Sequence, residues 1–168
     1  MLAFIDTMIL AWWVRKESSP GQSDMIVRSQ WLMESLEQQK ATVMISTVSL
    51  AEFLRGSSPH QQAEQAAFLQ QAFVVMGFDM LSAIVAAELY PNVASMDDYE
   101  KRRTALKADI QIVATACAAK ATVFYSHDAA CRKLAKAGGI DARDLPDIAP
   151  TLFHENGGED EEDTSLLR

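Results

Sequence analysis

Four acidic residues stand beside predicted strand ends or in a predicted core helix, and they are the candidates for chemistry: Asp6, Glu52, Asp109 and Asp128. Carboxylates packed together repel one another and raise one another's pKa. A hard divalent cation such as Mg²⁺ or Mn²⁺ removes that repulsion, because these ions prefer oxygen ligands. A cation held in this way can polarise a phosphoryl oxygen and activate a water molecule for in-line attack. The residue types therefore point to metal-dependent phosphoryl chemistry, provided that the fold brings the four acids together.

Short apolar runs predict the strands that would position these acids, at residues 2–5, 41–45, 73–78, 122–125 and 140–145. Runs with no solvated face are typical of a parallel sheet that is covered on both sides. Helical segments alternate with them, which predicts an α/β domain with three layers and a mainly parallel sheet of four to five strands. In such a sheet the carboxyl ends of the strands share one edge, where ligands bind.

Each acid taken alone also has a purely structural explanation. Asp6 and Asp128 could cap the helices that follow them. Glu52 could complete a capping box with Ser49, and Asp109 could be an ordinary acid near a helix start, favoured by the helix dipole. Four acids in similar contexts nevertheless favour a shared site over four independent explanations.

A cluster of basic residues precedes Asp109 and consists of Lys101, Arg102, Arg103 and Lys107. It could hold phosphate groups on a path into the acidic site, or it could be the solvated face of a charged helix. Residues 96–107 could form a loop or the first turns of a long helix, and the sequence alone leaves both open.

The negative charge of the chain belongs mainly to its end. The 168 residues carry a formal net charge of −8, but residues 141–168 hold nine acidic and two basic residues, whereas residues 1–140 hold fourteen acidic and thirteen basic ones. We therefore expect one domain at residues 1–150 and an acidic, disordered tail at residues 151–168. A nearly neutral body can still bind a polyanion through local basic clusters.

The chain has two cysteines and no CxxC motif, which predicts a cytoplasmic protein without a structural zinc site. It has no long apolar run, so we expect no membrane span.

Several segments together resemble a PIN domain. They are FIDT at residues 4–7, STVSLAEFLRG at 46–56, LKADIQIVATA at 106–116 and SHD at 126–128. The resemblance covers residues 1–145 and is strongest to the small prokaryotic ribonucleases that act as toxins in VapBC-type toxin–antitoxin pairs. The chain departs from the family pattern at Ser126, where threonine is more usual, and in the length of the segment 90–107.

The resemblance implies an endoribonuclease that uses Mg²⁺ or Mn²⁺ to hydrolyse RNA phosphodiester bonds. It assigns catalysis and metal binding to Asp6, Glu52, Asp109 and Asp128, and a supporting hydroxyl to Thr7 or Ser126. It also implies a small antitoxin as partner and a homodimer. Two alternatives remain at this stage. One is a catalytically inactive PIN-like module that binds RNA or protein. The other is a phosphotransferase or phosphatase, although that class favours a second acid two residues after the first, where this chain has Met8.

Overall fold

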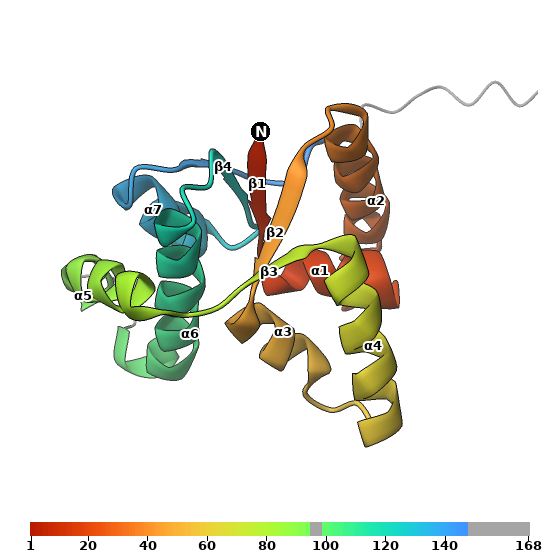
Figure 1. Cartoon of the computed structure of the whole chain (residues 1–168), viewed down its shortest axis with the longest axis horizontal. Coiled ribbons are helices and arrows are strands. Elements are labelled where there is room, and N and C mark those ends of the chain that lie inside the picture. Colours follow the sequence, from red (N-terminus) through yellow and green to blue (C-terminus); the bar gives the residue numbers. More distant parts are fainter. Residues whose placement is uncertain (95–98, 148–168) are drawn as a thin grey trace, which may run out of the picture.

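The computed structural model describes residues 1–94 and 99–147. In this part of the chain five strands form one sheet: β1 (Leu2–Ile5), β2 (Thr42–Ser46), β3 (Val74–Met76), β4 (Val123–Tyr125) and β5 (Asp141–Arg143). Seven helices surround it (Figure 1): α1 (Thr7–Arg15), α2 (Ser23–Gln38), α3 (Thr47–Leu54), α4 (Pro59–Ala72), α5 (Met80–Ala94), α6 (Tyr99–Ala118) and α7 (Ala129–Ala137). The predicted α/β class, the three layers and the five strands are confirmed.

The sheet is parallel throughout, and its strand order is β3-β2-β1-β4-β5. The first strand of the sequence therefore lies in the middle of the sheet. Phe4 is in register with Met44 of β2 on one side and with Phe124 of β4 on the other. Because all strands run the same way, the residues that follow β1, β2 and β4 come out at the same edge.

Alternate residues of β1 face two different cores, as the two-residue period of a strand requires. Phe4 packs in a cluster with residues of α5, α6 and α7, whereas Ala3 and Ile5 pack in a second cluster with residues of α1, α2, α3 and α4. Figure 1 shows α5, α6 and α7 on one side of the sheet and α1, α2 and α4 on the other. Burial on both faces explains why the run at residues 2–5 contains no polar residue.

The structure answers the question about the charged segment before Asp109, because α6 begins at Tyr99. The acidic tail at residues 151–168 lies outside the described residues, so the predicted domain boundary stays a prediction. No helix in the described ranges is both long and apolar enough to cross a bilayer.

Candidate active site

Asp6 lies where β1 ends and α1 begins. Its backbone N–H donates to the Tyr125 carbonyl (3.0 Å), which extends the pairing of β1 with β4. Its carboxylate accepts hydrogen bonds from the Thr7 N–H (2.7 Å) and from the Ser126 hydroxyl (2.7 Å). The side chain therefore caps α1, as one interpretation predicted, and also contacts the end of another strand. Only 5% of the residue is exposed.

Burial raises the pKa of Asp6 above its ordinary value, because the charged form loses its hydration. The hydrogen bonds from Ser126 and Thr7 oppose that rise, and the nearby carboxylates of Glu52 and Asp128 add to it. The ionised form of Asp6 is thus disfavoured by its surroundings. A cation bound to Asp6 would remove this penalty on its ionised form.

Glu52 reaches the same edge from α3. The hydroxyl of Thr7 donates to its carboxylate at 2.7 Å, which ties the start of α1 to α3. The capping box with Ser49 is wrong, because α3 begins earlier than that motif requires. Ser46 is the capping residue, and its hydroxyl accepts from the Ser49 N–H (2.8 Å).

Asp128 caps α7, and its carboxylate accepts from the N–H groups of Ala130 (2.6 Å) and Cys131 (3.3 Å). Its own N–H donates to the Ser126 hydroxyl (3.0 Å), the same hydroxyl that donates to Asp6. Ser126 is fully buried, and it connects the two strand-end acids directly.

Asp109 comes from the middle of α6, so its interpretation as an acid at a helix start is wrong. It lies near the thiol of Cys131 in α7, whose pKa it helps to raise. Burial, and after it the negative charges of Asp6, Asp109 and Asp128, raise the pKa of that thiol. The buried Cys131 therefore lies among three of the four predicted acids. Sequence reasoning did not select it, because it lies on the buried face of α7 and belongs to no cysteine motif.

The basic cluster is described only in part. The side chains of Lys101, Arg102 and Arg103 lie outside the described part of the structure. Lys107 is exposed and lines a cavity of about 470 Å³ between α5 and α6. Residues two apart do not face each other on an α-helix, so Lys107 and Asp109 point to different sides of α6. Lys107 stays a prediction as a phosphate-binding residue.

The donor set fits Mg²⁺ or Mn²⁺ chemically, because the predicted ligands offer carboxylate oxygens and one of them is buried with a raised pKa. However, within residues 1–94 and 99–147 no three acidic, histidine or cysteine side chains converge in a geometry that would hold a metal ion. Glu52 and Asp128 act on the charge of Asp6 as neighbours, but in this part of the chain the acids are not arranged as a coordination cage.

Comparison with solved structures identifies the fold. The chain is similar to a chain of VapBC2 from Rickettsia felis, solved bound to a DNA fragment from its promoter, at 14% identity and a TM-score of 0.60; the match covers 87% of this chain and 100% of the other. It is similar to a chain of VapBC-1 from nontypeable Haemophilus influenzae at 12% identity and a TM-score of 0.60, over 86% and 98% of the two chains. The fold is PIN-like. No family model matches the sequence, and no curated protein matches it. The predicted resemblance is thus confirmed at the level of the PIN-like fold.

Proposed function

We propose that this protein is a Mg²⁺- or Mn²⁺-dependent endoribonuclease. The observation that carries the proposal is the buried carboxylate of Asp6 at the end of the central strand, with a raised pKa to which Glu52 and Asp128 contribute. A folded chain gains no stability from a buried acid whose ionised form is disfavoured. A bound divalent cation would pair with the ionised carboxylate and remove that penalty. The PIN-like fold supports the same proposal.

In this proposal the four acids share the binding of the cation. When bound, the cation would neutralise charge on the scissile phosphate and activate the attacking water. Asp6 and Asp128 would hold it from two strand ends, and Glu52 and Asp109 from two helices. Ser126 would orient Asp6, and Thr7 would orient Glu52, through the hydrogen bonds that their hydroxyls donate.

The names of the two similar structures extend the proposal to a partner. Both are VapBC complexes, so we propose that this protein is the toxin of such a pair and is held by a small antitoxin protein. We further propose that it acts in the cytoplasm on RNA and forms a homodimer. A small gene immediately beside this one, whose product binds the protein and blocks cleavage, would support this extension.

Asp109→Asn tests the nuclease directly. The substitution keeps the shape of the side chain and removes its charge, so we expect Mn²⁺-dependent cleavage of single-stranded RNA to be abolished while the circular dichroism spectrum is unchanged. Asp141→Asn is the matched control, because Asp141 is an exposed acid on β5 whose partner is Arg143 (2.6 Å). An Asp109→Asn variant as active as the wild type would remove Asp109 from the site.

One observation favours a second candidate, a PIN-like module that binds RNA or protein without cutting. It is the lack of a converged ligand cage among the described side chains. The two candidates differ in their response to Mn²⁺. A nuclease should show a rise in melting temperature with Mn²⁺, since a ligand that binds only the folded state stabilises it. A binding module should bind RNA equally well in EDTA, with no cleavage and no such rise.

A further inference from the structure

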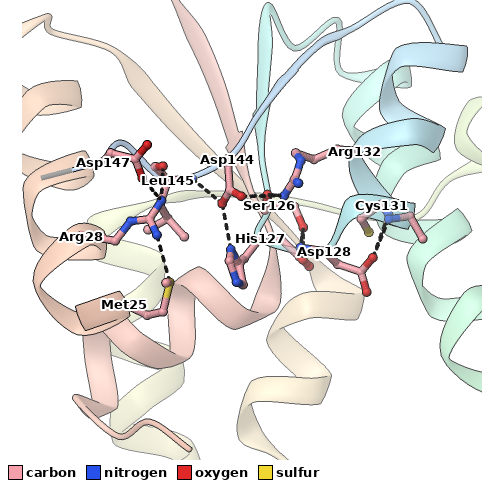
Figure 2. A network of polar contacts seen from close by, with 12 residues as sticks. Met25, Arg28, Ser126, His127, Asp128, Cys131, Arg132, Asp144, Leu145 and Asp147 are labelled. Atoms are coloured by element: carbon pink, nitrogen blue, oxygen red, sulfur yellow. Dashed lines mark hydrogen bonds and ion pairs between the residues drawn. The ribbon is translucent and has the colours of Figure 1, made fainter. Parts of the chain in front are cut away.

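A second polar network lies beside the four acids, at the ends of β4 and β5 (Figure 2). Tyr125 of β4 is in register with Arg143 of β5, so the residues that follow them, Ser126 and Asp144, emerge side by side. The Ser126 N–H donates to the Arg143 carbonyl (3.1 Å), which continues the pairing past the last strand residue. Asp144 therefore stands next to the segment 126–128, which carries two groups of the candidate site.

The carboxylate of Asp144 contacts three different groups. One oxygen, Oδ1, lies 2.9 Å from His127 Nδ1 and accepts from the Leu145 N–H at 2.7 Å. The other, Oδ2, lies 3.1 Å from Nη1 of Arg132. Both side-chain partners, His127 and Arg132, come from the β4–α7 region, so a single side chain of the neighbouring segment holds that region from outside the acidic site.

Arg132 links Asp144 to the candidate site. The same Nη1 atom that meets Asp144 also donates to the Ser126 carbonyl at 2.7 Å. The hydroxyl of Ser126 in turn donates to Asp6 and accepts from the Asp128 N–H. Ser126 is thus fixed through its carbonyl by Arg132 and through its hydroxyl by the two acids.

Further contacts keep the two ends of this network in place. The ring of His127 meets the ring of buried Trp12 in α1 edge-to-face, with centroids 5.7 Å apart. On the other side, Arg28 of α2 donates to the carbonyls of Leu145 (2.6 Å) and Pro146 (3.0 Å). In Figure 2, Arg28, Leu145, Asp144 and Ser126 follow one another across the view. The residues after Asp144 are therefore anchored to α2.

We propose that Asp144 is a positioning residue for the carboxylate site and acts through Arg132 and His127. It fixes the backbone of residues 126–128, so that the Ser126 hydroxyl faces Asp6 and the Asp128 carboxylate stays at the shared edge. The inference rests on the proposed function, because the Ser126 hydroxyl and the Asp128 carboxylate are positioned to help bind the cation that RNA cleavage needs. The Asp144 and Arg132 side chains are 36% and 22% exposed, and ion pairs of that kind add little to the folded state.

The test uses four variants of the full chain and a measurement of Mn²⁺ affinity. Asp144→Ala removes the central carboxylate, and Arg132→Met removes the donor while keeping the length of the side chain. Arg132→Lys restores one terminal nitrogen with several N–H groups, which suffices because Nη1 alone makes both contacts. Asp141→Ala is the control, since it breaks another acid–arginine pair on the same strand without touching residues 126–128.

We expect Asp144→Ala and Arg132→Met to weaken Mn²⁺ binding about 10-fold or more, the usual effect of removing groups that orient ligands. The kcat for RNA should fall by a similar factor while KM stays the same, because none of these groups is proposed to touch RNA. Arg132→Lys should recover most of the Mn²⁺ affinity, and Asp141→Ala should match the wild type. Amide hydrogen exchange at residues 126–128 should be faster in Asp144→Ala and in Arg132→Met only.

Two results would overturn the inference. The first is an unchanged Mn²⁺ affinity in both Asp144→Ala and Arg132→Met. The second is an equal loss in all four variants, which would indicate general destabilisation. If the wild type itself fails to bind Mn²⁺ or to cut RNA, the proposed function is wrong, and hydrogen exchange alone decides the positioning role. Exchange at residues 126–128 that is faster in Asp144→Ala but not in Asp141→Ala supports it, and unchanged exchange refutes it.

Discussion

Asp6→Asn should make the metal-free protein more stable at neutral pH. The reason lies in the raised pKa of Asp6, which burial causes and to which the charges of Glu52 and Asp128 add. An acid whose pKa is higher in the folded state than in the unfolded state keeps its proton longer in the folded state. Below both pKa values the two states bind the same proton and the group has no effect. As the pH rises through the unfolded and then the folded pKa, the wild type loses stability.

The size of the effect follows from the same linkage. One pKa unit of difference between the states corresponds to about 1.4 kcal/mol at a pH above both values. We therefore expect Asp6→Asn to raise the metal-free free energy of unfolding at pH 7, and the size of the gain measures how far folding raises the pKa of Asp6. Asparagine caps helices as well as aspartate does, so α1 should keep its cap. Its amide can also face Ser126, whose hydroxyl can rotate to accept in place of donating.

Asp6→Ala separates charge from capping. It removes the same charge, but it also removes the acceptor of the Thr7 N–H and of the Ser126 hydroxyl. The lost cap alone costs about 1 kcal/mol, so the alanine variant should be less stable than the asparagine variant at every pH. The difference between the wild type and the asparagine variant should instead vanish at low pH and grow toward neutral pH.

Urea unfolding in EDTA, followed by tryptophan fluorescence, measures these differences. The buried Trp12 gives a signal from the core beside the site. Repeating the series with Mn²⁺ should reverse the order, because the wild type binds the cation and the asparagine variant binds it weakly. The linkage explanation is wrong if Asp6→Asn is less stable than the wild type at pH 7 without metal. It is also wrong if the gap between them does not change between pH 3 and pH 7.

Three further predictions concern the groups around the acids. Arg102→Ala combined with Arg103→Ala should weaken RNA binding and reduce the slope of affinity against salt concentration by about one unit per lost phosphate contact, measured by fluorescence anisotropy; an unchanged slope would make these residues a solvated helix face. Deleting residues 155–168 should raise RNA affinity most at low salt, since screening limits the field of the tail to about 10 Å at 0.1 M salt. Overlapping RNA-binding curves of the full-length and truncated proteins at low salt would exclude competition by the tail. Thr7→Val should lower Mn²⁺ affinity by releasing Glu52, with a melting temperature close to that of the wild type in EDTA as the control; equal Mn²⁺ affinity would show that the hydroxyl does not orient Glu52.

The sheet could be predicted from the sequence because its signal is local. Each strand is a short apolar run, and burial on both faces by helices leaves no polar position in the central one. Once the runs are recognised as parallel strands, the common edge follows from geometry. The placement of Asp6 and Asp128 at that edge therefore needed no knowledge of long-range contacts.

The remaining features depend on contacts between distant segments. The thiol of Cys131 in α7 lies near Asp109 of α6, and Arg132 of α7 contacts Asp144, which follows β5. Nothing in the local pattern of residues 126–147 marks these pairs. The start of α3 was also misjudged, because serines at positions 46 and 49 can each cap a helix, and only the end of β2 at Ser46 decides between them.

Capping and site formation are not competing roles for these acids. Asp6 and Asp128 cap α1 and α7, so backbone N–H groups at two helix starts face two of the four carboxylates. Such groups favour negative charge. The Thr7 hydroxyl donates to Glu52, so a third acid also has a donor from a neighbouring element. These donors offset part of the repulsion, so the chain can fold with Asp6, Glu52 and Asp128 near one another without a cation. The pKa of Asp6 stays raised, mainly by burial and in smaller part by Glu52 and Asp128, and Mn²⁺ binding should remove that penalty.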